Sequence, residues 1–284
     1  MKVGSGKSLQ NVIDVWHVRA AIEAEGPVEQ FCSRYLHPDE TAHAARFRVP
    51  SARHQHIVGR GMARVVLAGN DHAPETIRFR QLDQGKPVVA APRALRRPFN
   101  IAHTSGLVIC GVAGTNGCSP DAPTESTGDR AEPAEEATTA GASTEPWLGV
   151  DVESLQRRPD LGLARRYFAP EEIAQIERSR EADAHQLFLQ IWTLKEAFIK
   201  AIGTGLRTPL DAFAFVDVEG GRPELTFHDP ALARGRRWYC ESFQPRPGFV
   251  AAIAWGTPTI HEATGRRDAS MPLVRLHDFQ SWVG

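Results

Sequence analysis

Two carboxylates stand two residues apart in the stretch 148–153, LGVDVE. Apolar residues alternate there with Gly149, Asp151 and Glu153, which is the period of a β-strand, so both acids are expected on one strand face. Two neighbouring carboxylates repel each other unless a cation lies between them. Mg²⁺ is held by a few carboxylates and completes its shell with water and phosphate oxygens, and Gly149 leaves space where a ligand could approach. The pattern therefore indicates a magnesium–phosphate site.

A helical segment further along the chain carries a second pair of charges, Glu196 and Lys200. Four residues apart, the two side chains share one face of the helix, where such pairs are commonly solvated surface support. If this helix packs across the strand, Glu196 supplies a third carboxylate and Lys200 faces the phosphate charge. The apolar stripe that predicts the helix, which ends at Gly203, consists of Leu187, Ile191, Leu194, Phe198 and Ala201.

Four blocks of sequence, taken in order, carry a family resemblance. They are GKP at residues 85–87, FNIAHTSG at 99–106, LGVDVE at 148–153 and WTLKEAFIKAIG at 192–203. The last two complete the patterns G-[IV]-D-[IV]-E and W-x-x-K-E-[AS]-x-x-K, and the second is close to FN-[IL]-S-H-S. Over roughly residues 36–255 the chain resembles the 4′-phosphopantetheinyl transferases of the surfactin-synthetase-activating type.

The resemblance implies a fold and a reaction. The fold is α+β, with two pseudo-two-fold-related halves, each of helices and antiparallel sheet, and the active site in the cleft between them. The reaction moves the 4′-phosphopantetheine arm of coenzyme A to a serine of an apo carrier protein (acyl, peptidyl or aryl) and releases 3′,5′-ADP. Mg²⁺, with Mn²⁺ as the alternative, is expected on the pyrophosphate, and the protein is expected to be a cytoplasmic monomer.

The resemblance also assigns roles to the charged residues of the last two blocks. Asp151, Glu153 and Glu196 are the implied metal ligands, and Asp151, Glu196 and Lys200 also contact the cofactor. Lys200 neutralises charge on the phosphate. Glu196 is either the base for the serine or the residue that positions a metal-bound water, and the sequence leaves both alternatives open. Lys195, about 100° round the helix from Glu196, is expected to face solvent or the edge of the cofactor.

Further cofactor contacts are implied upstream. His103 matches the family's catalytic and cofactor-binding histidine, and Lys86 in GKP is a candidate for the adenine or a phosphate. Arg46 and Arg53 are our candidates for the 3′-phosphate. The chain departs from the family pattern at Glu40 and His43, where the family has lysines, and at Ala102, where it has serine. One phosphate contact is therefore expected to be lost or shifted to Arg80 or Arg48.

Composition limits the class of protein. Hydrophobic residues make up 42% and charged residues 24% of 284, as in soluble globular proteins, and no apolar run is long enough to span a membrane. The four cysteines are scattered, which argues against a zinc knuckle or a disulfide framework. Basic residues do not form the stripe with interleaved aromatics that nucleic-acid binding needs, so no nucleic-acid partner is expected.

One segment, residues 114–146, contains no large apolar side chain and seven acids against one arginine. Such a segment has nothing to bury, so we predict a disordered acidic insertion. It separates an N-terminal half, residues 1–113, from a C-terminal half, residues 147–260, and residues 261–284 form an extension. Without the insertion the remaining chain is mildly basic, which suits a polyphosphate cofactor and an acidic partner.

Two other functions remain as alternatives. One is another Mg²⁺-dependent phosphotransferase or a nuclease with a carboxylate cluster. The other is a non-catalytic relative that binds coenzyme A or a carrier protein, but its carboxylates should have eroded, whereas Asp151, Glu153, Glu196 and Lys200 are all present.

Overall fold

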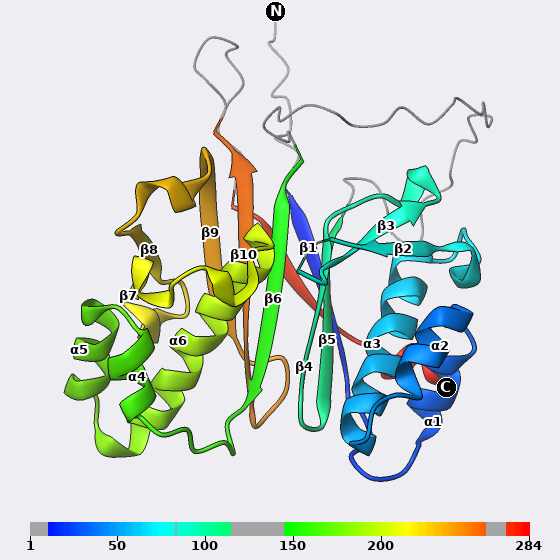
Figure 1. Cartoon of the computed structure of the whole chain (residues 1–284), viewed down its shortest axis with the longest axis horizontal. Helices are drawn as coiled ribbons and strands as arrows, with labels where there is room; N and C mark the ends of the chain where they lie inside the picture. The colour runs from blue at the N-terminus through cyan, green and yellow to red at the C-terminus, as the bar shows by residue number, and fades with distance from the viewer. Residues whose placement is uncertain (1–10, 83, 115–144, 260–270) are drawn as a thin grey trace, which may run out of the picture.

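The computed structural model describes residues 11–82, 84–114, 145–259 and 271–284, and they form the predicted α+β fold (Figure 1). The N-terminal half consists of β1 (Val12–Val18), α1 (Pro27–Ser33), α2 (Pro38–Ala44), α3 (Pro50–Ala68), β2 (Arg78–Gln81), β3 (Pro87–Ala91), β4 (Phe99–Thr104) and β5 (Leu107–Gly114). The C-terminal half consists of β6 (Trp147–Ser154), α4 (Gly162–Tyr167), α5 (Pro170–Arg178), α6 (Glu181–Ile202), β7 (Phe213–Val216), β8 (Glu224–Phe227), β9 (Arg236–Phe243) and β10 (Phe249–Pro258). The final elements are β11 (Leu273–Asp278) and α7 (Gln280–Val283). The predicted acidic insertion lies outside the described residues, apart from its two ends.

Two sheets form the centre of the molecule. One has the strand order β11-β1-β5-β4 and the other β6-β10-β9, while β2-β3 and β7-β8 are separate two-stranded sheets. The inward faces of the two large sheets share one apolar cluster, which contains Val15, Ile109, Val150 and Ile253. Helices α1 to α3 cover the outside of the first sheet and α6 covers the second, so β6 lies between α6 and the N-terminal half (Figure 1).

The predicted catalytic helix is confirmed as the second half of α6. All five residues of its apolar stripe are buried in one core cluster against β7, β9 and β10. The helix ends at Ile202, and Gly203 follows with φ 72°, a left-handed conformation that glycine adopts without steric cost. The strand predicted from the LGVDVE block is β6.

The two halves repeat one topology. In each half a strand is followed by two short helices, one long helix, a small hairpin and two further strands. The first strand pairs with the last in both cases, β1 with β5 and β6 with β10. The last also pairs with the strand before it, β5 with β4 and β10 with β9. This correspondence confirms the predicted pseudo-two-fold body.

A buried ion pair recurs in both copies. In the N-terminal half Arg64 Nη1 lies 2.6 Å from Glu40 Oε2, and in the C-terminal half Lys195 Nζ lies 2.8 Å from Glu172 Oε2. Each glutamate is the third residue of a short helix that begins with proline, and each accepts the backbone N–H of its helix N-cap residue. Glu40, where the chain departs from the family pattern, is thus a structural residue that joins α2 to α3.

The expectation for Lys195 is therefore wrong. Its side chain is 0% exposed and its ammonium also donates to the carbonyls of Leu210, at 2.6 Å, and Phe213, at 2.7 Å. All three polar partners come from segments outside α6. A buried ammonium must find such partners, because its charge is costly to remove from water. Lys195 anchors α6 to the rest of the half and does not face solvent.

Gly149 was predicted to leave space for a ligand, but the structure places the backbone of helix α6 there. The face of β6 that lacks a side chain there is covered by the backbone of α6, not by a ligand. A Cβ at this position would lie 2.0 Å from the Ala197 carbonyl oxygen and 2.5 Å from the Ala201 nitrogen. The glycine lets helix and strand approach closely, and this contact brings α6 alongside Asp151.

Gly149→Ala is expected to lower the free energy of unfolding by at least about 2 kcal/mol, because helix α6 must move away from the strand. Urea unfolding measures the change. Gly220→Ala is the matched control, since nothing lies within 4 Å of a Cβ at that position. Equal stability of the two variants would contradict the close helix–strand contact.

The C-terminal residues return to the N-terminal half. Strand β11 pairs in parallel with β1, and Arg275 binds Asp14 with contacts of 2.8 and 3.0 Å. Phe279 is fully buried in the N-terminal core. Within the described residues, no helix combines the length and the apolar character needed to cross a membrane.

Candidate active site

The carboxylates predicted on one strand face meet α6 where the sequence places them. Lys200 Nζ lies 2.6 Å from Asp151 Oδ1, so the lysine of the helix binds the aspartate of the strand. Asp151 is buried, while Glu153 and Lys200 are partly exposed. Glu196, one turn before Lys200, is close enough to influence the charge of Asp151. The structure therefore brings the four predicted residues together at the contact of β6 with α6.

The pKa values of two of these carboxylates, Asp151 and Glu196, are raised chiefly by burial. Burial raises the pKa of Asp151 to about 7, Lys200 opposes that rise, and Glu196 and Glu153 add to it. The pKa of Glu196 is also raised, first by burial and then by Glu153. The effect of burial on Asp151 thus outweighs the opposing effect of its ion pair with Lys200.

Asp151→Asn is expected to stabilise the metal-free protein by about 1–3 kcal/mol at pH 8, because the buried charge is removed. The folded-state pKa of about 7 lies above the ordinary value of 3.8, so the folded protein binds a proton that the unfolded chain has lost. Wild-type stability is consequently lost as the pH rises from about 4 to about 7, and the advantage of the variant grows over that window.

Urea unfolding at pH 5 and pH 8 measures this effect. Asp183→Asn is the control, because the side chain of Asp183, in the first turn of α6, is 46% exposed and pairs with its neighbour Arg180. If the difference in free energy of unfolding between Asp151→Asn and wild type does not grow with pH, the raised pKa of Asp151 is contradicted.

Glu153 is held on both of its oxygens. Thr104 Oγ1 donates to Oε2 at 3.0 Å, and Arg157 pairs with Oε1. Within the described ranges, no three potential ligand side chains stand close enough together to form a metal-binding group. The donor set nevertheless fits a hard cation, since it consists of carboxylate oxygens, and the pKa values of Asp151 and Glu196 are raised.

His103 lies on β4, across from these groups. Its side chain is exposed, and its pKa is lowered by the surrounding protein and by the charge of Lys200, while Glu153 opposes the shift. The imidazole is therefore neutral at pH 7 and able to accept a hydrogen bond or a proton.

The other predicted cofactor residues lie in different places. Lys86 Nζ donates to the carbonyls of Leu148, at 2.9 Å, and Ala201, at 3.2 Å, and burial lowers its pKa to about 8. Arg46 is exposed just after α2, and Arg53 is exposed in the first turn of α3. Lys86 thus joins the N-terminal half to β6 and α6, whereas the arginines stand free on the N-terminal surface.

Two residues of the FNIAHTSG block that were not predicted from the sequence contact β6. Asn100 is 4% exposed and its Oδ1 accepts the backbone N–H of Val150 at 2.9 Å, and Thr104 binds Glu153. Alternate residues of β4, including the buried Ala102, thus meet β6. The strand period of two could have indicated that Asn100 and Thr104 share a face.

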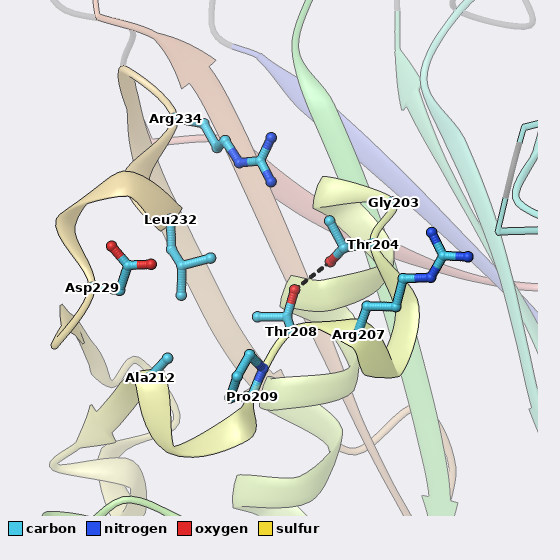
Figure 2. A pocket seen from close by; sticks show the side chains of 9 residues that line it. All are labelled: Gly203, Thr204, Arg207, Thr208, Pro209, Ala212, Asp229, Leu232 and Arg234. Atoms are coloured by element: carbon cyan, nitrogen blue, oxygen red, sulfur yellow. Dashed lines mark hydrogen bonds between the residues drawn. The ribbon is translucent and has the colours of Figure 1, made fainter.

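A pocket of about 390 Å³ opens beyond the C-terminal end of α6 (Figure 2). Thr204 and Thr208 bind each other at 2.6 Å on one side of it, and Arg207 and Arg234 also line it. None of the predicted site residues lines it. The carboxylate site and this pocket are therefore separate features.

Comparisons with known proteins converge on one family. The family described as the 4′-phosphopantetheinyl transferase superfamily matches residues 148–254, which include Asp151, Glu153, Glu196 and Lys200. A Synechocystis protein, slr0495, is 31% identical over 60% of this chain, and the chain spans 58% of that relative, less than two thirds of its length. The 4′-phosphopantetheinyl transferase HetI of Nostoc is 28% identical over 77% of this chain and 78% of its own. Sfp of Bacillus subtilis, a 4′-phosphopantetheinyl transferase, is 24% identical over 82% and 88%. Over residues 148–254 the chain is thus similar to the 4′-phosphopantetheinyl transferase superfamily, and these relatives share that similarity over most of the chain.

Proposed function

We propose that the protein transfers the 4′-phosphopantetheine arm of coenzyme A to a serine of an apo carrier protein. The serine oxygen forms a bond to the phosphorus of the pantetheine phosphate, the bond from that phosphorus to the bridging oxygen breaks, and 3′,5′-ADP leaves with the electron pair. The serine proton passes to a base. The observation that carries the proposal is the group of Asp151, Glu153, Glu196 and Lys200 at the contact of β6 with α6, inside the region of the family match.

The three carboxylates are our proposed holders of Mg²⁺, with Mn²⁺ as the alternative. Bound there, the ion would neutralise the pyrophosphate and polarise the bond to the leaving group. Lys200 pairs with Asp151 at 2.6 Å and is partly exposed, so its ammonium can turn to the phosphate oxygens when other positive charge balances Asp151. Positioning and charge neutralisation carry most of the catalysis in such displacements.

The proton of the serine has two candidate routes. Glu196 can accept it directly if it is not bound to the metal ion, because its raised pKa in the metal-free protein makes it a better base than an ordinary glutamate at neutral pH. Alternatively, Glu196 orients a water that takes the proton. His103, neutral at pH 7, is proposed to bind a phosphate oxygen or assist as a hydrogen-bond partner of the cofactor.

The remaining cofactor contacts are proposed for the N-terminal half. Two of the three ammonium hydrogens of Lys86 are used on backbone carbonyls, which leaves one for the adenine or a phosphate. Arg46 and Arg53, both exposed, are proposed for the 3′-phosphate. Cys32, Cys110 and Cys240 are free thiols, which agrees with our proposal of a cytoplasmic location. We also propose that the protein is a monomer.

The test is the release of 3′,5′-ADP, followed by chromatography. The proposal predicts release only when the protein, coenzyme A, Mg²⁺ and an apo carrier protein are all present, and loss of release when EDTA is added. Replacing the carrier by its serine-to-alanine variant is the control. Release without the carrier would indicate a hydrolase of the pyrophosphate, and binding of coenzyme A without release from any class of carrier would favour a non-catalytic relative.

A further inference from the structure

Strand β4 of the N-terminal half contacts strand β6 of the C-terminal half, and we call this contact the seam. The two strands belong to different sheets, so β6 presents to β4 an edge with free backbone groups. Side chains of the N-terminal half form hydrogen bonds with these backbone groups: Asn100 accepts the N–H of Val150, and Lys86 donates to the carbonyl of Leu148. At the end of the seam, Thr104 binds a side chain, that of Glu153.

Resting on the proposed function, we infer that Thr104 is a positioning residue that holds Glu153 in the orientation in which it binds the metal ion. The Thr104 hydroxyl donates to Glu153 Oε2 at 3.0 Å, and Thr104 is buried, so the bond is shielded from water. Partners of this kind, which hydrogen-bond a metal ligand, orient it and tune its affinity.

The two oxygens of Glu153 have partners that differ in exposure to solvent. Oε2 is held by a buried threonine on a strand. Oε1 is paired with Arg157, whose side chain is 53% exposed on the loop after β6. An exposed arginine exchanges readily for another cation, because a surface ion pair contributes little free energy. One oxygen is thus fixed, while the other can be released to an incoming metal ion.

Thr104 is itself fixed by the N-terminal half. Gln55 on α3 is buried, and its Nε2 donates to the Thr104 carbonyl at 2.8 Å. The chain of contacts from α3 through β4 to Glu153 crosses between the halves. The orientation of one proposed metal ligand therefore depends on the docking of the opposite half, which contributes no carboxylate of its own to the site.

The experiment measures Mn²⁺ binding to the full-length protein by electron paramagnetic resonance, without substrate. Thr104→Val, which keeps the shape and removes the hydroxyl, is expected to weaken Mn²⁺ binding about tenfold. Thr104→Ser is expected to restore it to within about threefold, since the hydroxyl returns. Thr226→Val is the matched control: its hydroxyl bonds to the Ala214 carbonyl in the β7-β8 hairpin, and no change is expected.

Kinetics separate positioning from folding. Under the inference, Thr104→Val raises the metal concentration needed for half-maximal transfer about tenfold and leaves kcat at saturating metal within about threefold of wild type. A Thr104→Val protein that is folded by circular dichroism and binds Mn²⁺ like wild type overturns the inference, while transfer by the wild type leaves the proposed function intact. A wild type that neither binds Mn²⁺ nor transfers overturns both.

Discussion

Glu196→Gln is expected to lower kcat/KM for transfer about 10³-fold. The substitution removes the carboxylate charge at the contact of α6 with β6, where Glu196 is proposed both to bind the metal and to take or direct the serine proton. Loss of a general base costs about 10²–10⁴-fold, and loss of an electrostatic stabiliser costs a similar factor. The rate is measured with saturating Mg²⁺ and an apo carrier protein.

Glu181→Gln is the control for this prediction, because Glu181 is an exposed acid in the first turn of the same helix. It should retain the wild-type rate. A Glu196→Gln variant within fivefold of wild type would contradict the role of this residue.

Lys195→Met is expected to lower the free energy of unfolding by about 3–5 kcal/mol, because it leaves Glu172 buried without its cation. Glu172 is 0% exposed and also accepts the N–H groups of Ala169 and Phe215, so it cannot turn to solvent. The double variant Lys195→Met/Glu172→Gln is expected to recover part of the loss, because no buried charge then remains. Urea unfolding measures both variants.

The control is an exposed pair of the same half. Arg165 and Glu177 lie 2.9 Å apart, with side chains 74% and 53% exposed, and Arg165→Met should change stability by less than about 1 kcal/mol. Near-wild-type stability of Lys195→Met, together with a large loss of transfer, would mean that Lys195 acts on the cofactor, one of the two alternatives that the sequence left open, and not as an anchor.

Regular periodicity made much of the fold predictable. Alternation over residues 148–153 predicted a strand, and the spacing of the apolar residues before Gly203 predicted α6, because one buried face imposes a period of 2.0 or 3.6. Spacing also predicted that Glu196 and Lys200 share one helix face, which would lie next to Asp151. Their grouping required only that α6 pack across β6.

Other features depend on partners that are distant in sequence. Lys195 lies in the same motif as Glu196, and only the position of Glu172, on another helix, decides that its ammonium is buried. Lys86 reaches a carbonyl at the end of α6, and Thr104 reaches Glu153 across the seam. Periodicity places a side chain on a face of its own element but does not say which element covers that face.

The internal repeat explains why one half alone carries the carboxylates. Aligning β5 with β10 by their similar sequences places Trp16 of β1 in the position of Asp151 of β6. Trp16 packs in the N-terminal core and stacks on His277, with ring centroids 4.4 Å apart. The equivalent position is therefore apolar and filled, and the N-terminal half contributes His103 and the seam contacts instead of a second metal site.

The most direct test of the proposed transfer is the intact mass of an apo carrier protein after incubation with this protein, coenzyme A and Mg²⁺. The expected result is a gain of one phosphopantetheine on the carrier with the wild type, and no gain with EDTA or with Glu196→Gln. An unchanged mass with fatty-acid, polyketide and peptide carriers alike, under conditions in which a known member of the superfamily modifies them, would contradict the proposed function.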